Sequence, residues 1–404
     1  MKSTYKRKFT NQTVFLSTIL GAILLIAPNV SAQTQPRPAA QTLPKAAATN
    51  QIEQVFAFNN QMPTGVTVSQ SGRIFVNYPR WEDKVDFTVA ELKNGREIPF
   101  PDANVNRLNV PNAVDTFVSV QSVVVDPKDR LWILDTGSIN LGPIVSPNAP
   151  KLVCVDLTTN KIIKTIRFAS DVVLPTTYLN DIRFDLRKGA DGAAYITDSS
   201  AIGPNAIIVV DLASGQSRRV LNGHPSVSPE PLFTAFVEGE SVMQRKPGQP
   251  PRHISLGADG IAIGADGSRL YYCPLASRKL YSVSTDALLD ASAADSQVAA
   301  TVKMEGEKPA ADGLESDAQG RIYTTAYELN GIMRRTADGT DFETIVHDPR
   351  VLWADTMSVA GDGYLYFTAN QLHRQGGYHN GRDLRQKPYS LFRVKIDGTP
   401  VLLR

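Results

Sequence analysis

VVVDPKDRLWIL, residues 123–134, consists of a short apolar strand, a turn that contains Asp, and a second strand rich in aliphatic and aromatic residues. This is the sequence pattern of a β-hairpin. The pattern recurs five more times, as VTVSQSGRIFVN from residue 66, IRFDLRKGADGAAYITD from 182, IAIGADGSRLYYC from 261, LESDAQGRIYTTA from 314 and MSVAGDGYLYFTA from 357. Such a repeat indicates a fold built from six similar units.

The turns and the spacing of these hairpins predict four strands in each unit. Every turn holds a residue suited to a positive φ angle, within Ser71-Gly72, Lys128-Asp129, Asp191-Gly192, Asp266-Gly267, Gln319-Gly320 and Asp362-Gly363. The copies begin 57, 59, 79, 53 and 43 residues apart, which leaves room for two further strands after each hairpin. Candidates for these outer strands are residues 151–157, 161–168, 206–212, 217–221, 279–284, 390–396 and 400–404.

We therefore predict an all-β fold, a six-bladed β-propeller with four-stranded antiparallel blades over residues 51–404. A parallel α/β fold would need amphipathic helices between its strands, and only residues 285–296 offer one. A pair of β-sandwiches would not explain six copies of one hairpin.

The N-terminus predicts export. A basic start is followed by a short apolar run over residues 14–27 and by the small residues Val30-Ser31-Ala32, so residues 1–32 resemble a cleaved signal peptide. The alternative is an uncleaved anchor. Residues 33–50 are poor in large apolar residues and are expected to form a disordered leader. We expect a secreted protein, periplasmic or extracellular, that is a monomer without a membrane contact after cleavage.

The charge balance and the two cysteines indicate whether the protein binds nucleic acid and whether it contains a disulfide. The balance of 42 basic against 40 acidic residues argues against a nucleic-acid partner. Cys154 and Cys273 fall in strands of different blades, so we expect two buried thiols rather than a disulfide. Residues 222–256 hold six prolines and form an insertion between blades 3 and 4, which is either a lid or binding loop or a mobile surface loop.

The candidate site follows from the propeller itself. The first strand of each blade lines the central channel, so the residues just before it lie at one channel mouth. These residues are Gly65, Gln121, Asn180-Asp181, Asp259-Gly260, Asp312-Gly313 and Asp355-Thr356. Carboxylates from four blades would therefore converge there. Either a cation such as Ca²⁺ neutralises them, or some take up protons as their pKa values rise. The alternative is that Asp before Gly serves only local turns.

The tryptophans and histidines are weaker candidates for functional residues. Trp81, Trp132 and Trp353 are expected to pack between blades, although Trp353 is close enough to Asp355 to offer an aromatic platform for a cationic aromatic amine. His373 and His379 do not have metal-ligand spacing, so we expect them to be solvated or hydrogen-bonded.

Several stretches resemble the major royal jelly/Yellow family. They are NYPRW (77–81), SVVVDPKDRLWILDTG (122–137), YLNDIRFD (178–185), YITDSS (195–200), DGIAIGADGSRLYYCPLASRKLYSV (259–283), FTANQLHR (367–374) and DLRQKPYSLFRVKI (383–396). The resemblance implies a six-bladed propeller. It also implies, from insect members, dopachrome conversion or the binding of biogenic amines. Calcium-dependent gluconolactonases are more distant relatives. Asn180 and Asp312 resemble two of their metal ligands and Asp259 stands at a third, but Thr64-Gly65 replaces their first-blade Glu.

Three functions follow as expectations. The first is a propeller that binds, and in an enzymatic version tautomerises, a small aromatic or quinone-like molecule at the channel mouth. Asp181 or Asp355 would then move a proton, and the ligand would contact Asn180, Asp259, Asp312, Gln121 and Trp353. The second is a lactonase that uses a divalent metal on Asn180, Asp259 and Asp312. The third is a non-catalytic propeller that binds a partner through a face or through residues 222–256.

Overall fold

The computed structural model describes residues 51–81, 83–336, 339 and 341–404, which belong to one compact unit. The predicted signal peptide and leader lie outside the described residues. Within the described ranges no helix is long and apolar enough to cross a membrane.

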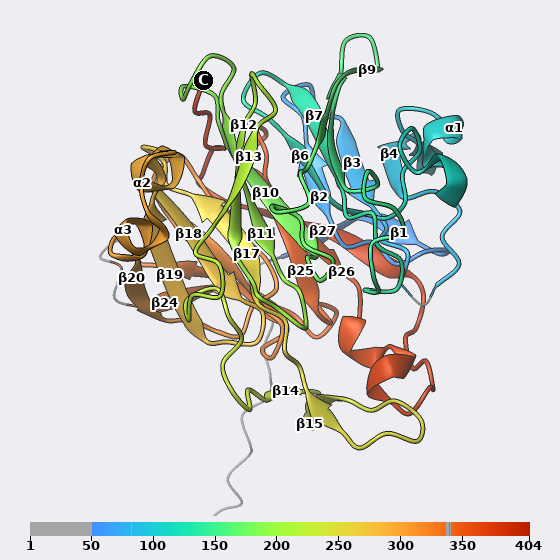
Figure 1. Ribbon diagram of the computed structural model, residues 1–404. Helices are drawn as coiled ribbons and strands as arrows, with labels where there is room; N and C mark the ends of the chain where they lie inside the picture. Colours follow the sequence, from blue (N-terminus) through green and yellow to red (C-terminus); the bar gives the residue numbers. More distant parts are fainter. Residues whose placement is uncertain (1–50, 82, 337–338, 340) are drawn as a thin grey trace, which may run out of the picture. The chain divides into compact units, whose positions relative to one another are not determined.

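Six four-stranded antiparallel sheets confirm the predicted propeller (Figure 1). Blade 1 consists of β2 (Val66–Val68), β3 (Ile74–Asn77), β4 (Val89–Lys93) and β5 (Arg96–Pro99). Blade 2 consists of β6 (Val120–Val125), β7 (Arg130–Asp135), β8 (Lys151–Asp156) and β9 (Lys161–Arg167). Blade 3 consists of β10 (Leu179–Asp185), β11 (Ala193–Asp198), β12 (Ile207–Asp211) and β13 (Ser217–Val220).

The second half of the chain forms the other three blades. Blade 4 consists of β17 (Ala258–Ile263), β18 (Arg269–Pro274), β19 (Lys279–Ser284) and β20 (Lys303–Glu307). Blade 5 consists of β21 (Leu314–Ser316), β22 (Ile322–Ala326), β23 (Gly331–Arg335) and β24 (Phe342–His347). Blade 6 consists of β25 (Ala354–Val359), β26 (Tyr364–Ala369), β27 (Tyr389–Lys395) and β1 (Glu53–Phe58).

The inner two strands of every blade are the six hairpins found in the sequence. A residue in each predicted turn has a positive φ angle: Gly72, Asp129, Gly192, Gly267, Gly320 and Gly363. Each inner strand contacts the next one around the ring, and β25 contacts β2, which closes the channel. The inner strands are almost entirely buried, as a fold that packs blade against blade requires.

The prediction that residues 400–404 form an outer strand is wrong. The outer position of blade 6 is taken by β1, which pairs with β27 and joins the two ends of the described chain. Residues 397–404 instead cross the inner strands, where Leu403 accepts a hydrogen bond from the Leu186 backbone N–H and is itself buried.

Short helical turns lie in the connections between strands, two of them between blades 1 and 2 and the others within blades 4 and 6. They are α1 (Ala103–Asn106), η1 (Val110–Asn112), α2 (Thr285–Leu289), α3 (Asp295–Ala299), η2 (Leu372–Arg374) and η3 (Gly376–Tyr378). The helical signal at residues 285–296 thus corresponds to two short helices. Both cysteines are buried free thiols, in β8 and β18, as predicted.

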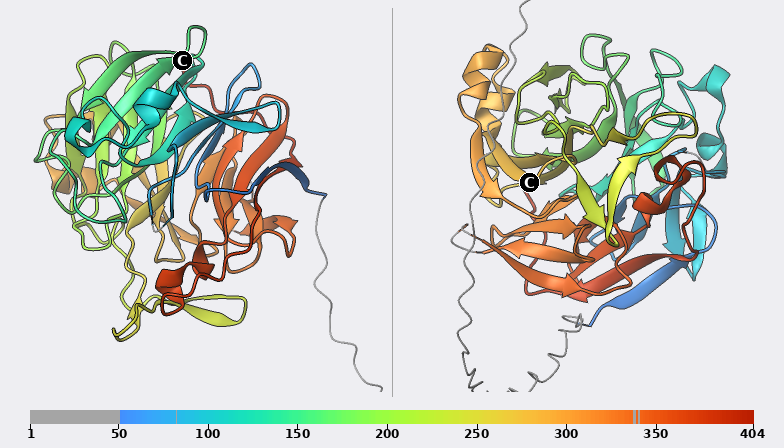
Figure 2. Two further views of the ribbon diagram at one scale, coloured as in Figure 1. Left: turned by 90° about the vertical axis from the view of Figure 1, so that its right-hand side faces the viewer. Right: turned by 90° about the horizontal axis from the view of Figure 1, so that it is seen from below.

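The insertion at residues 222–256 forms a small sheet of β14 (Ala235–Val237), β15 (Glu240–Gln244) and β16 (Arg252–His253). Figure 1 and the left view of Figure 2 place this sheet beside η2 and η3 on one face of the propeller, with the C-terminus on the opposite face. We name these the insertion face and the C-terminal face.

Candidate ligand-binding site

The predicted rim residues lie in β-bulges of the inner strands. In β6, β10, β17 and β25 the register with the next strand shifts at the rim, which leaves Gln121, Asn180-Asp181, Asp259-Gly260 and Asp355-Thr356 unpaired. A bulge bends its strand and redirects a side chain, and bulges are frequent beside functional sites. Local backbone irregularity therefore positions these side chains, rather than the regular alternation of a strand.

Glycines beside two of the rim aspartates let neighbouring blades approach closely. A Cβ on Gly260 would lie 2.7 Å from the Asp312 carbonyl oxygen, and one on Gly313 would lie 2.4 Å from the Asp355 carbonyl oxygen. Asp259-Gly260 and Asp312-Gly313 are therefore contacts between blades. This finding argues against the alternative that Asp precedes Gly here only to form a turn.

A pocket of about 240 Å³ opens at this mouth, on the insertion face. Four of the predicted residues line it: Gln121, Asn180, Asp259 and Asp312. The rest of the lining includes aromatic, apolar and polar side chains from several blades and from the insertion, among them Trp81, Tyr178, Gln244, Lys246, Leu256, Leu372, Gln375 and Tyr378.

Asp259 and Asp312 form a buried carboxyl pair in the pocket wall. Burial raises the pKa of Asp312 to about 6, even though hydrogen bonds from Trp353 and Asp259 lower it. Burial, followed by the charges of Asp312 and Asp355, raises the pKa of Asp259 well above its usual value. The pair therefore favours a shared proton, and the higher pKa of Asp259 makes its carboxyl group the stronger holder of that proton.

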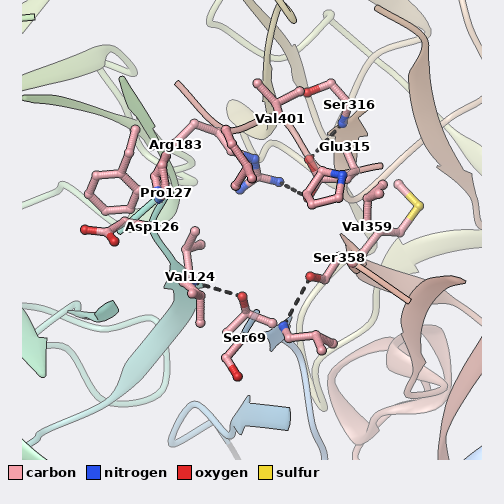
Figure 3. A pocket seen from close by; sticks show the side chains of 18 of the residues that line it. Ser69, Val124, Asp126, Pro127, Arg183, Glu315, Ser316, Ser358, Val359 and Val401 are labelled. Atoms are coloured by element: carbon pink, nitrogen blue, oxygen red, sulfur yellow. Dashed lines mark hydrogen bonds and ion pairs between the residues drawn. The ribbon is translucent and has the colours of Figure 1, made fainter. Parts of the chain in front are cut away.

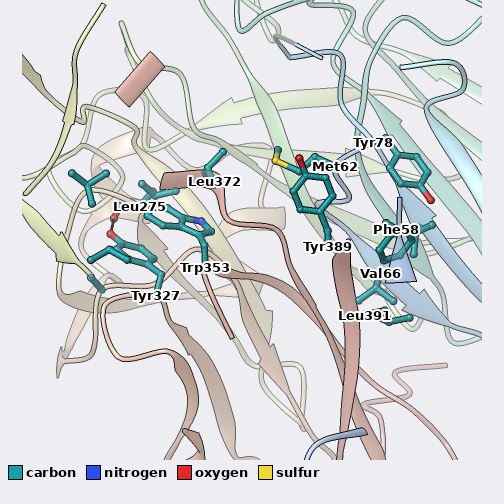
Figure 4. Packing of buried hydrophobic residues seen from close by; sticks show 14 of the residues in the cluster. Phe58, Met62, Val66, Tyr78, Leu275, Tyr327, Trp353, Leu372, Tyr389 and Leu391 are labelled. Carbon is teal, nitrogen blue, oxygen red and sulfur yellow. Dashed lines mark hydrogen bonds between the residues drawn. The ribbon is translucent and has the colours of Figure 1, made fainter. Parts of the chain in front are cut away.

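Trp353 supports this pair from behind. Its indole N–H donates to Asp312 Oδ2 at 2.6 Å, and its ring is fully buried between Tyr327 and His373, with ring centroids 4.1 and 5.8 Å away. Figure 4 shows the stacked Tyr327 and Trp353 rings beside Leu275 and Leu372. Trp353 cannot contact a ligand through its buried ring, so its place is that of a positioning residue and not of an aromatic platform.

We expect Trp353→Phe to raise the pKa of Asp312 from about 6 to ~7. The indole N–H stabilises the carboxylate, and losing a hydrogen bond of about 1.4 kcal/mol shifts the pKa by roughly one. Carbon-13 NMR of the aspartate carboxyl groups during a pH titration would measure the change. Tyr327→Phe is the control, since it removes a hydrogen bond from the same stack without touching Asp312. An unchanged Asp312 midpoint in Trp353→Phe would contradict the assignment.

The other two rim carboxylates lie outside this pocket. Asp181 accepts from Ser122 Oγ at 2.7 Å and forms an ion pair with Arg183 at 3.0 Å. Asp355 accepts from Asn370 Nδ2 at 2.7 Å and from Thr356 Oγ1 at 3.1 Å. Both are thus engaged by protein groups, and burial raises the pKa of Asp355 well above its usual value. The proton-transfer role of Asp181 and Asp355 stays a prediction, and the pocket lining adds Asp259 and Asp312 as candidates for it.

Arg183 and Glu315 line a second cavity, of about 430 Å³, that opens toward the C-terminal face (Figure 3). Val401 of the C-terminal segment forms part of its wall. Arg183 is buried and its guanidinium also donates to the Leu314 carbonyl oxygen, which ties β10 to β21. The charges of Asp181, Arg183 and Glu315 therefore form a structural network within the channel.

Trp81 and Tyr178 form an aromatic wall of the pocket that Asp259 and Asp312 also line. The Trp81 indole N–H donates to the Tyr178 hydroxyl at 2.7 Å, and that hydroxyl donates to Gln121 Oε1 at 3.0 Å. Burial raises the pKa of Tyr178, which keeps the hydroxyl protonated at neutral pH. The indole N–H of Trp81 and the hydroxyl of Tyr178 are therefore both bonded to protein groups.

The insertion helps to enclose the pocket. Gln244, Lys246 and Leu256 belong to its lining. Glu238, at the β14–β15 turn, is anchored by Arg374 at 2.5 Å and by His373 Nε2 at 2.8 Å. Hydrogen bonds lower the pKa of Glu238 to about 2, and those from Arg374 contribute more than the one from His373. The insertion is therefore a wall of the candidate site, and His373 has the predicted hydrogen-bonded role.

The donor set fits a proton better than Ca²⁺. A calcium ion takes six to eight oxygen ligands, whereas Asn180, Asp259 and Asp312 supply three side chains. One of them, Asp312, already accepts the Trp353 indole N–H. In blade 1 a side chain at Gly65 would require Asn77 to move, because its Cβ would lie 2.0 Å from Asn77 Oδ1. No cluster of three or more His, Cys, Asp or Glu suited to a metal occurs within the described ranges.

Sequence reasoning missed several lining residues. Trp81 was expected to pack between blades, but it lines the pocket and is only partly buried. Trp132 does pack between blades, with its ring 5.3 Å from that of Phe184. Tyr178 lies two residues before the bulge residue Asn180, and its place in the YLND stretch was a usable signal. Lys246 and Leu256 carried none, because the insertion has no repeat register.

Comparisons with known structures agree on the fold. A putative gluconolactonase has a TM-score of 0.52 at 11% identity, with 87% of this chain and 93% of that chain covered. A luciferin-regenerating enzyme gives 0.51 at 11% identity, with coverages of 87% and 99%. A gluconolactonase from Xanthomonas campestris gives 0.50 at 12%, with coverages of 86% and 89%. At such low identity the likeness establishes the propeller fold alone.

Comparisons of sequence identify the family. Protein yellow of Drosophila madeirensis is 30% identical over 292 residues, which cover 68% of this chain and 49% of that protein. Protein yellow of Drosophila melanogaster is 31% identical over 242 residues, with coverages of 57% and 42%. The chain thus spans about half the length of the curated relatives it matches. The profile of the family described as "Major royal jelly protein" matches residues 118–397, so the chain belongs to the major royal jelly protein family.

Proposed function

We propose that this protein binds a small aromatic or quinone-like molecule in the mouth pocket and transfers a proton on it. The observation that carries the proposal is the buried Asp259–Asp312 pair, which shares a pocket with the aromatic wall of Trp81 and Tyr178. A flat ring fits between such walls, and an ammonium group on the ligand would pair with the Asp312 carboxylate.

The pair is suited to tautomerisation, which moves a proton from one ligand atom to another. Asp312 would take a proton from a carbon next to a carbonyl group, and Asp259 would give its proton to the ligand at the other end of the shifted double bond. Because the two carboxyl groups interact closely enough to shift each other's pKa, a proton passing from Asp312 to Asp259 would restore the starting state. Asn180, whose amide lines the pocket, would orient the carbonyl oxygen.

Two measurements on the unaltered protein test the proposal. Titration with tyramine, followed by tryptophan fluorescence, tests binding beside Trp81. The decay of dopachrome with and without protein tests proton transfer. Tyramine binding together with faster dopachrome decay is the expected result. Binding without acceleration would reduce the function to that of a binding protein, and the lack of both would refute the proposal.

The metal-dependent lactonase is the second candidate, because Asn180, Asp259 and Asp312 line one pocket. We expect neither EDTA nor millimolar calcium to change the melting temperature, since the carboxyl pair shares a proton. A ligand that binds only the folded state raises that temperature by mass action. A rise with calcium that disappears in Asp312→Asn would favour the lactonase instead, and lactone hydrolysis would then be the assay.

A further inference from the structure

A groove adjoins the mouth pocket on its blade 2 and blade 3 side. Its volume is about 270 Å³. Five lining residues are common to both cavities: Leu141, Tyr178, Ala201, Ile202 and Leu256. The remaining groove residues are Gly142, Pro143, Pro175, Thr176, Thr177 and Ser200. The two cavities are therefore neighbouring parts of one depression. The groove is lined mainly by loops of blades 2 and 3, whereas the carboxyl pair belongs to blades 4 and 5.

The groove wall exposes large apolar side chains. Leu141 is 48% exposed and Ile202 is 85% exposed, and the two residues come from loops of different blades. Single exposed apolar residues are ordinary on protein surfaces. Two that line the same hollow, next to Pro143 and Pro175, form a continuous apolar surface of the kind that ligands cover.

Hydrogen bonds hold the backbone of the loop that carries Leu141. Leu141 has a φ of 54° and follows Asn140 with a φ of 56°, a conformation that is unfavourable for a bulky residue. The loop is fastened by bonds from Asn140 N–H to the Arg80 carbonyl and from Ser138 Oγ to the Gly142 carbonyl. The strained backbone at Leu141 exposes an apolar side chain to solvent, where that side chain adds nothing to the packing of the core.

Cavity size points the same way. Pockets for small molecules usually measure about 300–1,000 Å³. The mouth pocket alone, at about 240 Å³, is below that range, whereas the mouth and groove together fall within it.

We propose that the ligand is an aromatic molecule with an apolar tail, and that the tail lies in the groove formed by Leu141, Pro143, Pro175 and Ile202. This inference rests on the proposed function, because the aromatic head occupies the mouth pocket. The head would direct its polar group toward Asp259 and Asp312, the ring would lie by Tyr178, and an alkyl chain would leave from the opposite edge of the ring.

A series of 4-alkoxybenzylamines, from 4-methoxy- to 4-hexyloxybenzylamine, tests the inference by calorimetric titration. Each methylene that enters the groove should tighten binding about fourfold, the factor that corresponds to burying one methylene. Leu141→Ser and Ile202→Ser should flatten this dependence on chain length. Ile163→Ser is the matched control, because Ile163 is a similarly exposed isoleucine, 54%, on the outer strand β9.

The outcomes separate the two proposals. If the short 4-methoxy compound binds but longer chains bind no more tightly, the tail groove is refuted and the proposed function stands. A dependence on chain length that survives both groove substitutions also refutes the groove. If no member of the series binds at any length, the aromatic site and the groove fall together.

Discussion

Asp259→Asn is expected to slow dopachrome tautomerisation by at least about a hundredfold, the lower limit for loss of a general acid. The raised pKa of Asp259 favours the protonated carboxyl group, which is the form that can donate a proton. An amide of the same shape cannot deliver that proton. Asp312→Asn should have a similar effect on the rate, and should also weaken tyramine binding because it removes the carboxylate that faces the ammonium group.

The pH dependence follows from the same assignment. The rate should rise as pH passes the Asp312 pKa of about 6, because only the carboxylate can accept a proton. It should fall again at higher pH, where Asp259 loses its proton. The two limbs describe the pair as a whole, since its members interact strongly. Asp312→Asn should remove the lower limb.

Asp181→Asn and Asp355→Asn are the controls for this prediction. Both remove a buried rim carboxylate, but Asp181 faces Arg183 and Asp355 faces Asn370. Thermal melting would confirm that every variant is folded. If Asp181→Asn or Asp355→Asn slowed the reaction as much as Asp259→Asn, the assignment of the proton transfer to the Asp259–Asp312 pair would be refuted.

The fold was predictable because its repeat is local. A turn residue with a positive φ angle between two apolar strands specifies a hairpin wherever it occurs, and six such hairpins specify the blades. The closing of blade 6 was not predictable in this way. The pairing of β1 with β27 joins residues more than 330 positions apart, and the segment around Phe56 carries no repeat signal.

The site was predictable in place but not in detail. Position within the repeat located the rim, including Asn180, Asp259 and Asp312. It could not tell which carboxylates face the ligand, because bulges and partners decide this. Asn180 and Asp181 are adjacent, yet Asn180 lines the mouth pocket and Asp181 turns to Arg183. Both residues lie in the bulge of β10, where the register with β11 shifts, so the regular alternation of a strand does not predict which side each side chain takes.

Asp135→Asn is expected to lower the free energy of unfolding by about 3–5 kcal/mol, the usual loss when one partner of a buried ion pair is removed. Asp135 belongs to the LWILDTG stretch and is fully buried. It accepts from Lys151 Nζ at 2.9 Å and from the backbone N–H groups of Val118, Ser119 and Gly137. The substitution leaves the Lys151 charge, 2% exposed, without a counterion. The melting temperature should fall by on the order of 10 °C.

A double-variant cycle distinguishes an ion pair from simple packing. Lys151→Met added to Asp135→Asn should restore part of the lost stability, because it removes the unpaired charge from the interior. Asp86→Asn, in the exposed pair with Lys84, should change stability by no more than about 1 kcal/mol. Additive losses in the cycle would contradict the ion-pair account. If the pair is structural as described, the LWILDTG stretch, which contributes to the family resemblance, fixes blade 2 to the loop before it. In that case its presence is evidence of the fold, and the chemistry has to be argued from Asp259 and Asp312.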